Sequence, residues 1–229
     1  MNTTRTHPDI PVIYEDNHLL VIDKPSGLLS QEDHTGDPDV LTLCKSYIKK
    51  KYNKPGKVYL GLVHRLDRPV SGVMVLARTS KAASRLSEEI RKRRVEKTYW
   101  ALVNGQTPMF DDITHFLLKD NRSNTVKAYD KPRKGAKESR LRYTTIKQNR
   151  NHSLIEVELI TGRAHQIRVQ MAKSGFPLWG DYRYGDPGKD GKNIGLRAVR
   201  LKVKHPTQKE LMDFKAPVPK DTPWTMFEY

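Results

Sequence analysis

Short apolar runs, most of them separated by connections too short to carry a helix, are the feature of this sequence that most constrains its fold. Ile13–Asp23 reads as two strands around a turn at Asp16-Asn17, and Val95–Asn104 and Leu196–Val203 each read as one strand. Ser153–Ile160 alternates apolar and acidic residues with the period of a half-exposed strand. Parallel strands need crossovers of about a dozen residues or more, so most of these strands must pair antiparallel. The pattern predicts an α+β fold around a mostly antiparallel, mixed sheet flanked by helices and loops.

Three segments are expected to be helical, and two further apolar runs are expected to be buried strands. Ser80 is a candidate cap for a helix with a strongly basic outer face, and Thr161-Gly162 opens another. The expected helices are Leu41–Tyr52, Lys81–Arg94 and Arg163–Lys173, and the expected buried strands are Val58–Val63 and Val73–Leu76. We expect residues 106–139 to be an irregular, basic surface insertion, and a proline-rich tail to follow residue 203.

The chain of 229 residues is expected to form one domain over residues 12–229, after a flexible tail at residues 1–11. Lys and Arg total 42 against 26 Asp and Glu, a net charge of +16, which favours nucleic acid as the partner. Cys44 is the one cysteine, so it forms no internal disulfide, and we expect it to be a buried structural thiol. The absence of an apolar run of membrane-spanning length predicts a cytoplasmic protein, and we expect a monomer without an obligate protein partner.

The densest group of ionisable side chains is Val63–Gly72, between two apolar runs. It contains His64, Arg65, Asp67 and Arg68, and loops held between rigid strands are where catalytic groups tend to lie. An ordinary surface turn with an Asp–Arg ion pair would have the same spacing. A kinase catalytic loop is excluded because Leu66 separates His-Arg from the aspartate.

Two other segments could contribute to a site. In the helix predicted over Arg163–Lys173, His165 and Arg168 are three residues apart on one face, and the helix amides after Thr161, with Arg163, could bind a backbone phosphate. A solvated basic helix face is the plainer alternative. On the strand Val95–Asn104, Tyr99 and Trp100 point to opposite faces, so one of them could stack on a base unless both faces are covered.

Motifs for several cofactors are missing. The sequence has no Walker A loop, no dinucleotide fingerprint and no HExxH motif, and its eight histidines lack metal-ligand spacing. We therefore expect neither a metal nor an organic cofactor.

Taken in order, the motifs resemble the RluA-type RNA pseudouridine synthase family over nearly the whole chain. They are Asp16–Gly27, His64–Arg68 with Ser71-Gly72, Lys97–Tyr99, Thr161–Arg168 followed by Gly180-Asp181 and Tyr184-Gly185, and His205-Pro206 with Phe214–Pro217. The chain departs from the family pattern at Pro69-Val70, at Ala164 and near Arg197, where a histidine is common. No segment corresponds to the S4-type RNA-binding module that many relatives carry at the N-terminus.

The resemblance implies an isomerase that converts uridines in structured RNA, a ribosomal or transfer RNA stem-loop, to pseudouridine. It implies Asp67 as the nucleophile or charge-stabilising carboxylate, with Arg168 favouring its ionised form. Tyr99 is expected to stack on the uracil and to be a candidate for taking the C5 proton late in the reaction. Ile167 would form an apolar wall, and Arg65 would fill the space of an extruded base. His64, Arg163 and His165 are further candidates for substrate binding.

Two alternatives remain open: a catalytically silent RNA-binding protein or RNA chaperone on the same fold, and a general DNA-binding protein that uses charge alone.

Overall fold

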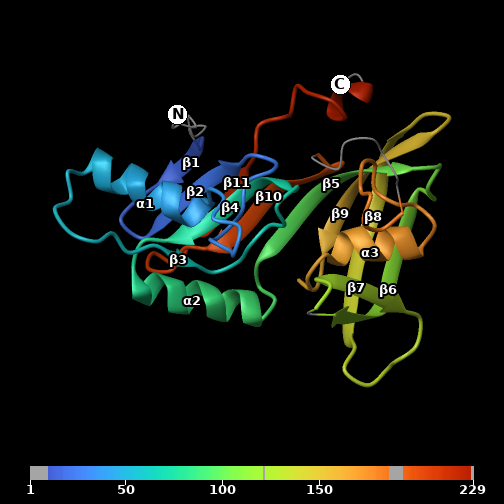
Figure 1. Ribbon diagram of the computed structural model, residues 1–229, viewed down its shortest axis with the longest axis horizontal. Helices are drawn as coiled ribbons and strands as arrows, with labels where there is room; N and C mark the ends of the chain where they lie inside the picture. Colours follow the sequence, from blue (N-terminus) through green and yellow to red (C-terminus); the bar gives the residue numbers. More distant parts are fainter. Residues whose placement is uncertain (1–9, 121, 186–192, 228–229) are drawn as a thin grey trace.

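The computed structural model describes residues 10–120, 122–185 and 193–227, so residues 1–9 of the predicted tail lie outside it. Eleven strands and three α-helices make up the described part, with one 3-10 turn near its end (Figure 1). The strands are β1 (Val12–Glu15), β2 (Leu19–Lys24), β3 (Gly61–Leu62), β4 (Ser71–Ala77), β5 (Glu96–Asn104), β6 (Phe110–Asp120), β7 (Thr125–Tyr129), β8 (Lys137–Gln148), β9 (His152–Leu159), β10 (Leu196–Lys204) and β11 (Leu211–Lys215). The helices are α1 (Val40–Lys51), α2 (Ser80–Arg91) and α3 (Gln166–Lys173), and the 3-10 turn is Trp224–Met226.

All eleven strands belong to one mixed sheet. Its order is β1-β2-β4-β10-β5-β9-β8-β6-β7, with β3 beside β4 and β11 beside β10. Every pairing between these strands is antiparallel except that of β4 with β10, where Arg197 lies opposite Ser71 and Ala198 opposite Gly72. The predicted α+β fold with a mostly antiparallel sheet is therefore confirmed.

The sheet spreads into two halves that share a core. Figure 1 shows α1 and α2 with the half formed by β1, β2, β4, β10 and β11, and α3 with the half formed by β6 to β9. Leu20 and Ile22 of the first half belong to the same buried cluster as Tyr143, Ile155 and Val157 of the second. Because apolar side chains pack continuously across the junction, a cleft between the halves has a rigid floor.

The first two helices begin at side-chain caps. The Asp39 side chain accepts a hydrogen bond from the Thr42 amide at the start of α1. At α2 the capping residue is Thr79, whose hydroxyl accepts from the Ala82 amide, so the prediction of Ser80 as the cap was wrong by one residue. A residue three positions before the amide that it caps satisfies a free N–H of the first turn, and only Thr79 has this spacing to Ala82.

Cys44 is buried on the inner face of α1, as predicted. Val40, Cys44 and Ile48 are spaced four residues apart and are all buried against the sheet. Burial raises the pKa of the Cys44 thiol to about 12, with a smaller contribution from the charge of Asp39. The thiol therefore stays protonated at neutral pH and serves as an apolar core group.

Residues 106–139 are the largest error of the sequence prediction. They are not a surface insertion but supply β6, β7 and the start of β8, which extend the sheet beyond β9. Ile113 and Leu117 of β6 and Val126 of β7 are buried, while most residues around them are exposed and charged or polar. Within this stretch, residues 131–135 do form a loop.

Two smaller differences concern short strands. Of the predicted strand Val58–Val63, only Gly61–Leu62 pairs with the sheet. The segment after residue 203, predicted as a proline-rich tail, contains β11. This strand pairs with β10, with Arg200 opposite Lys215 at one end and Lys204 opposite Leu211 at the other. None of the helices in the described ranges is long and apolar enough to cross a membrane.

Candidate active site

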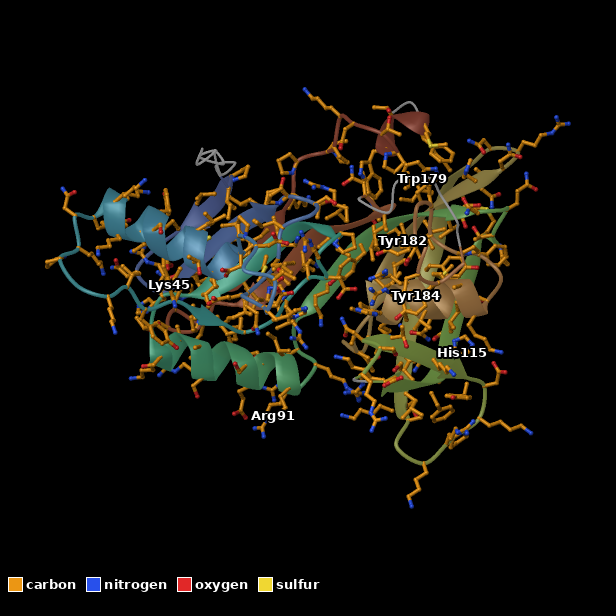
Figure 2. All side chains as sticks on the ribbon, viewed as in Figure 1. Lys45, Arg91, His115, Trp179, Tyr182 and Tyr184 are labelled. Atoms are coloured by element: carbon orange, nitrogen blue, oxygen red, sulfur yellow. The ribbon has the colours of Figure 1, made fainter. Side chains whose placement is uncertain are left out.

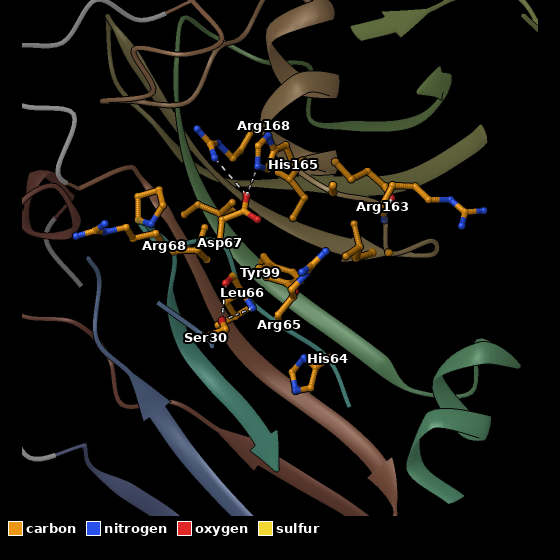
Figure 3. Close-up of a pocket in the computed structure, with 18 of the residues that line it drawn as sticks. Ser30, His64, Arg65, Leu66, Asp67, Arg68, Tyr99, Arg163, His165 and Arg168 are labelled. Atoms are coloured by element: carbon orange, nitrogen blue, oxygen red, sulfur yellow. Dashed lines mark hydrogen bonds and ion pairs between the residues drawn. The ribbon is translucent and has the colours of Figure 1, made fainter. Parts of the chain in front are cut away.

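A cleft of about 1470 Å³ opens between the two halves of the sheet. Its walls include the loop of residues 63–70 between β3 and β4, the segment that leads into α3, and part of β5. Asp67, Tyr99, Ile167 and Arg168 all line it, as do the other four residues predicted for the site. The three segments singled out from the sequence therefore meet in space (Figure 3).

The turn after β2 holds the loop of residues 63–70 by its backbone. The Ser30 hydroxyl donates to the Leu66 carbonyl at 2.7 Å and accepts from the Leu66 amide at 3.2 Å, as Figure 3 shows. The Ser26 hydroxyl donates to the Pro69 carbonyl at 2.7 Å. Because these bonds flank Asp67 on both sides, its position does not depend on substrate.

Lys24 makes a third connection between this turn and the loop. It is fully buried, and its ammonium group donates to the carbonyls of Pro25, Leu28 and Arg68 at 3.0, 2.6 and 3.1 Å. Burial lowers the pKa of Lys24 to about 7, although the charge of Asp67 opposes the shift. The sequence alone did not predict this contact.

Gly72 allows β4 to approach β10 directly beyond the loop. Its φ of +116° lies in the region that favours glycine, and a Cβ at this position would collide with the backbone of Ala198. Any side chain here would push the parallel pair of strands apart and move the loop that carries Asp67.

The Asp67 carboxylate faces two groups from the α3 segment. Arg168 Nη1 donates to Asp67 Oδ2 at 3.2 Å, and His165 Nε2 lies 3.9 Å from the same oxygen (Figure 3). The Asp67 side chain is 27% exposed, whereas that of Arg168 is only 6% exposed. Thus the carboxylate reaches the open cleft while its cationic partner is buried behind it.

A second carboxylate fixes the guanidinium of Arg168. Arg168 Nε and Nη2 donate to the two carboxylate oxygens of Asp181 at 2.7 and 2.8 Å. Burial would lower the pKa of Arg168, but the bonds to Asp181 and the charge of Asp67 hold it above its ordinary value. Arg168 therefore remains a cation that presents one N–H group to Asp67.

The start of α3 corrects the sequence prediction. The helix begins at Gln166, not at Arg163, and His165 before it has a left-handed backbone with φ of 51°. Gln166 Oε1 accepts from the Thr161 hydroxyl at 2.8 Å and from the Arg163 amide at 3.0 Å. The amides after Thr161 therefore belong to a turn and not to the first turn of a helix, and the Arg163 amide is already bonded to Gln166.

Tyr99 is buried at the base of the cleft, in the main core. Burial, and then the charge of Asp67, raises the pKa of its hydroxyl, so the phenol stays protonated at neutral pH. Its neighbour Trp100 packs on the other face of the sheet against a cluster that contains Trp224 and Phe227. Both faces of β5 are covered, which accounts for two adjacent aromatic residues on one strand.

The predicted binding residues differ in how freely they reach the cleft. Arg65 and Arg163 are exposed side chains on its walls. One edge of the His64 ring is already bonded, because its Nε2 accepts a hydrogen bond from the Val75 amide at 3.0 Å. Burial, together with the charge of Lys97, lowers the pKa of His64 to about 4. Only the other edge of that ring could contact a nucleotide.

The departures at Pro69-Val70 and Arg197 have local partners. The Val70 amide donates to the Asp67 carbonyl at 3.0 Å, which closes a turn around the acid. Arg197 pairs with Asp23 at 2.7 Å behind the loop, and both side chains are largely buried.

Among the described residues, no group of three His, Cys, Asp or Glu side chains could hold a metal ion.

The order and geometry of these segments agree with a known family. Residues 18–173 match the family model for RNA pseudouridylate synthase. The chain belongs to the RNA pseudouridylate synthase family. The resemblance to the RluA-type pseudouridine synthases is thereby confirmed, and with it the assignment to the isomerases that modify RNA.

Curated pseudouridine synthases match almost the whole chain. Ribosomal large subunit pseudouridine synthase D of Xanthomonas campestris is 35% identical over 237 residues, which cover 95% of this chain and 70% of the relative. Synthase C of Vibrio parahaemolyticus is 32% identical over 214 residues, covering 90% of this chain and 65% of the relative. An uncharacterised RNA pseudouridine synthase of Bacillus subtilis is 31% identical over 215 residues, which cover 93% of this chain and 70% of the relative. The chain thus spans about two thirds of the length of these pseudouridine synthases.

The pseudouridine synthase fold is also found in solved structures. The structure of human RNA pseudouridylate synthase domain containing 4 superposes with a TM-score of 0.76 at 23% identity, over 92% of this chain and 89% of that one. The structure of human RNA pseudouridylate synthase domain containing 1 superposes with a TM-score of 0.72 at 23% identity, over 91% of this chain and 83% of that one. At this level of identity the likeness supports the fold alone.

Proposed function

We propose that this chain converts uridine in structured RNA to pseudouridine and that Asp67 acts at the junction of sugar and base. The reaction breaks the bond from uracil N1 to ribose C1′, turns the base and joins C5 to C1′, while C5 loses a proton and N1 gains one. No electrons are exchanged, so the reaction asks for an ionised carboxylate and a pocket rather than a redox group.

The placement of Asp67 is the observation that carries this proposal. Its carboxylate opens into the cleft, and the N–H that it accepts comes from an arginine locked in place by Asp181. An arginine fixed in this way donates to the carboxylate and holds it in one orientation toward the open cleft. An ordinary surface ion pair would not need a second, buried carboxylate to orient the arginine.

Tyr99 and Ile167 would form the sides of the base pocket. Both line the cleft beside Asp67 and are almost fully buried. Because its pKa is raised, Tyr99 supports stacking on the uracil better than removal of the C5 proton as a phenolate.

A base in a stem cannot reach Asp67 without leaving its stack, so we expect the target uridine to be extruded. Arg65 is exposed two residues before Asp67 and carries a planar group that could fill the vacated space. Arg163, His165 and the free edge of His64 would contact the nucleotide or its phosphates from the cleft walls.

Basic residues continue from the cleft onto both halves of the molecule. Arg91 and Arg93, at the end of α2, and Lys119, on β6, line its edges. We expect the stretches 85–97 and 119–142 to bind RNA backbone, with an affinity that falls steeply with salt. The relatives named as ribosomal large subunit synthases favour ribosomal over transfer RNA. A cytoplasmic monomer with one catalytic domain over residues 12–229 is part of the same proposal.

The decisive experiment compares Asp67→Asn with Asp213→Asn. Asp213 is also an ion-paired aspartate, but it lies on β11 and pairs with Arg200 outside the cleft. Asp67→Asn should abolish pseudouridine formation in total RNA from cells lacking the gene. Its affinity for RNA should stay within about threefold of the wild type, a change in binding free energy smaller than the contribution of one strong contact. Turnover by Asp67→Asn at the rate of the control would remove Asp67 from the chemistry.

The same experiment separates the alternatives. A silent RNA-binding protein would bind RNA with the same salt dependence, yet the wild-type chain would convert no uridine. A general DNA-binding protein would bind duplex DNA as tightly as structured RNA at matched salt. The buried Arg168–Asp181 pair behind Asp67 argues against both, because neither binding mode has a use for it.

A further inference from the structure

The turn that follows α3 brings a second side chain, Tyr184, to the groups around Asp67. Asp181, at the start of this turn, binds Arg168, and the Tyr184 amide donates back to the Asp181 carbonyl at 3.2 Å. Figure 2 labels Tyr184 beside α3, where its hydroxyl lies 2.6 Å from His165 Nδ1. Among the motifs recognised in the sequence, Tyr184-Gly185 is one to which the proposed reaction assigns no task.

The hydrogen bonds of the Tyr184 hydroxyl determine which nitrogen of His165 carries the proton. The Val126 amide of β7 donates to this hydroxyl at 3.0 Å, so it already occupies an acceptor position of the oxygen. The hydroxyl hydrogen is then free to point to His165 Nδ1, and with this orientation Nδ1 is the acceptor. Burial lowers the pKa of His165, so the ring is neutral at neutral pH and its single hydrogen lies on Nε2.

Nε2 is the atom that faces the catalytic carboxylate. It lies 3.9 Å from Asp67 Oδ2, which is too long for a hydrogen bond. The N–H group is therefore directed into the cleft beside Asp67, where an oxygen of a bound nucleotide could accept from it. The opposite tautomer would present a lone pair to the carboxylate at the same place.

Tyr184 also contacts the second group that faces Asp67. The guanidinium carbon of Arg168 lies 5.2 Å from the centre of the Tyr184 ring, within the range of a cation–π contact. His165 stands directly before α3 with a left-handed backbone, and its side chain makes no capping hydrogen bond to the helix. One tyrosine thus restrains both the imidazole and the guanidinium that surround the acid.

We propose that Tyr184 is a positioning residue that holds His165 as a neutral Nε2–H donor facing Asp67 and the bound nucleotide. The inference rests on the proposed function, but the state of the histidine can be measured without RNA. Tyr184 acts through His165 and does not touch the reacting atoms. Its hydroxyl is the group that matters, whereas its ring is retained in Tyr184→Phe.

The first experiment reads the tautomer by NMR. Protein labelled with ¹⁵N in histidine is measured at about pH 7.5, above the lowered pKa of His165, and His165→Asn identifies the signal by its loss. Asn is suited to this because it tolerates a left-handed backbone. We expect an Nε2–H tautomer in the wild type and a mixture of tautomers in Tyr184→Phe. An Nδ1–H tautomer in the wild type, or an unchanged one in Tyr184→Phe, would overturn the proposal.

The second experiment measures turnover. Loss of one hydrogen bond that orients a catalytic neighbour should lower kcat of Tyr184→Phe by about tenfold and leave KM within about twofold. In a His165→Asn background the same change should lower kcat by less than about twofold, because the group on which it acts is absent. An equal loss in both backgrounds would contradict the proposed route through His165.

Tyr143→Phe is the matched control for loss of a buried tyrosine hydroxyl. Tyr143 is buried in β8, and its hydroxyl has no hydrogen-bond partner among the described residues. Its turnover should equal that of the wild type. If the wild type forms no pseudouridine on any RNA, the proposed function fails, but the NMR result still decides whether Tyr184 sets the tautomer.

Discussion

Acidification from pH 7 to pH 4 should destabilise this protein through His64, a histidine in the loop of residues 63–70. His64 Nε2 accepts a hydrogen bond from the Val75 amide at 3.0 Å. A protonated imidazole carries hydrogens on both ring nitrogens, so it cannot accept this bond. Burial and the positive charge of Lys97 also disfavour the cation, and together they lower the pKa of His64 from 6.5 to about 4.

The sign and size of the effect follow from the two pKa values. Between pH 6.5 and pH 4 the unfolded chain binds more protons at this site than the folded chain, so the free energy of unfolding decreases as the pH falls. The stabilisation is complete above pH 6.5 and is lost as the pH falls through the folded value of about 4. The difference of 2.5 between these values corresponds to about 3 kcal/mol, and partial solvent access to the ring reduces it to about 2–3 kcal/mol.

Urea unfolding of the wild type and of His64→Gln isolates this contribution. The glutamine amide oxygen can accept from the Val75 amide but does not titrate, and the other acidic and basic groups are common to both proteins. From about pH 7 to about pH 4.5 the wild type should lose about 2 kcal/mol more than the variant. Parallel loss of stability in the two proteins would refute the assignment of His64 as a neutral brace of the loop.

Two further predictions concern buried groups away from solvent. Asp181→Asn should lower the free energy of unfolding, measured in urea, by about 3 kcal/mol, because it removes one partner of a buried ion pair with Arg168. A change below about 0.5 kcal/mol would mean that Asp67 alone compensates the charge of the arginine. Cys44 should resist alkylation in the folded protein at about pH 8, since a pKa of about 12 leaves only about one thiol in ten thousand ionised; rapid labelling would show that α1 opens or that the thiol is not buried.

Much of the fold could be predicted because its patterns are local. The helix predicted over Leu41–Tyr52 corresponds to α1, and the alternation of apolar and acidic residues along Ser153–Ile160 predicted β9. Such periodicities follow from the geometry of a helix or strand with one buried face, whatever lies opposite.

The strands β6, β7 and β8 could not be predicted in the same way. Many of their buried positions alternate with exposed ones, but several are polar, among them His115, Ser139 and Thr145, so the apolar residues alone do not show the alternation. Ladder bonds join these strands to their neighbours, as in the pairing of Phe110–Leu117 with residues 137–144. Backbone pairing of this kind leaves little trace in side-chain hydrophobicity.

The amino-acid order by itself determined which residue types were available for the site, since Asp67, Tyr99 and Arg168 stand in motifs that can be read along the chain. Only the tertiary structure decided that Asp181 buries its carboxylate against Arg168, that Lys24 and Ser30 hold the loop, and that His165 precedes α3 in a left-handed turn. Asp67 and Arg168 are 101 positions apart. The strength and geometry of their ion pair depend on distance and burial in space, and spacing along the chain specifies neither.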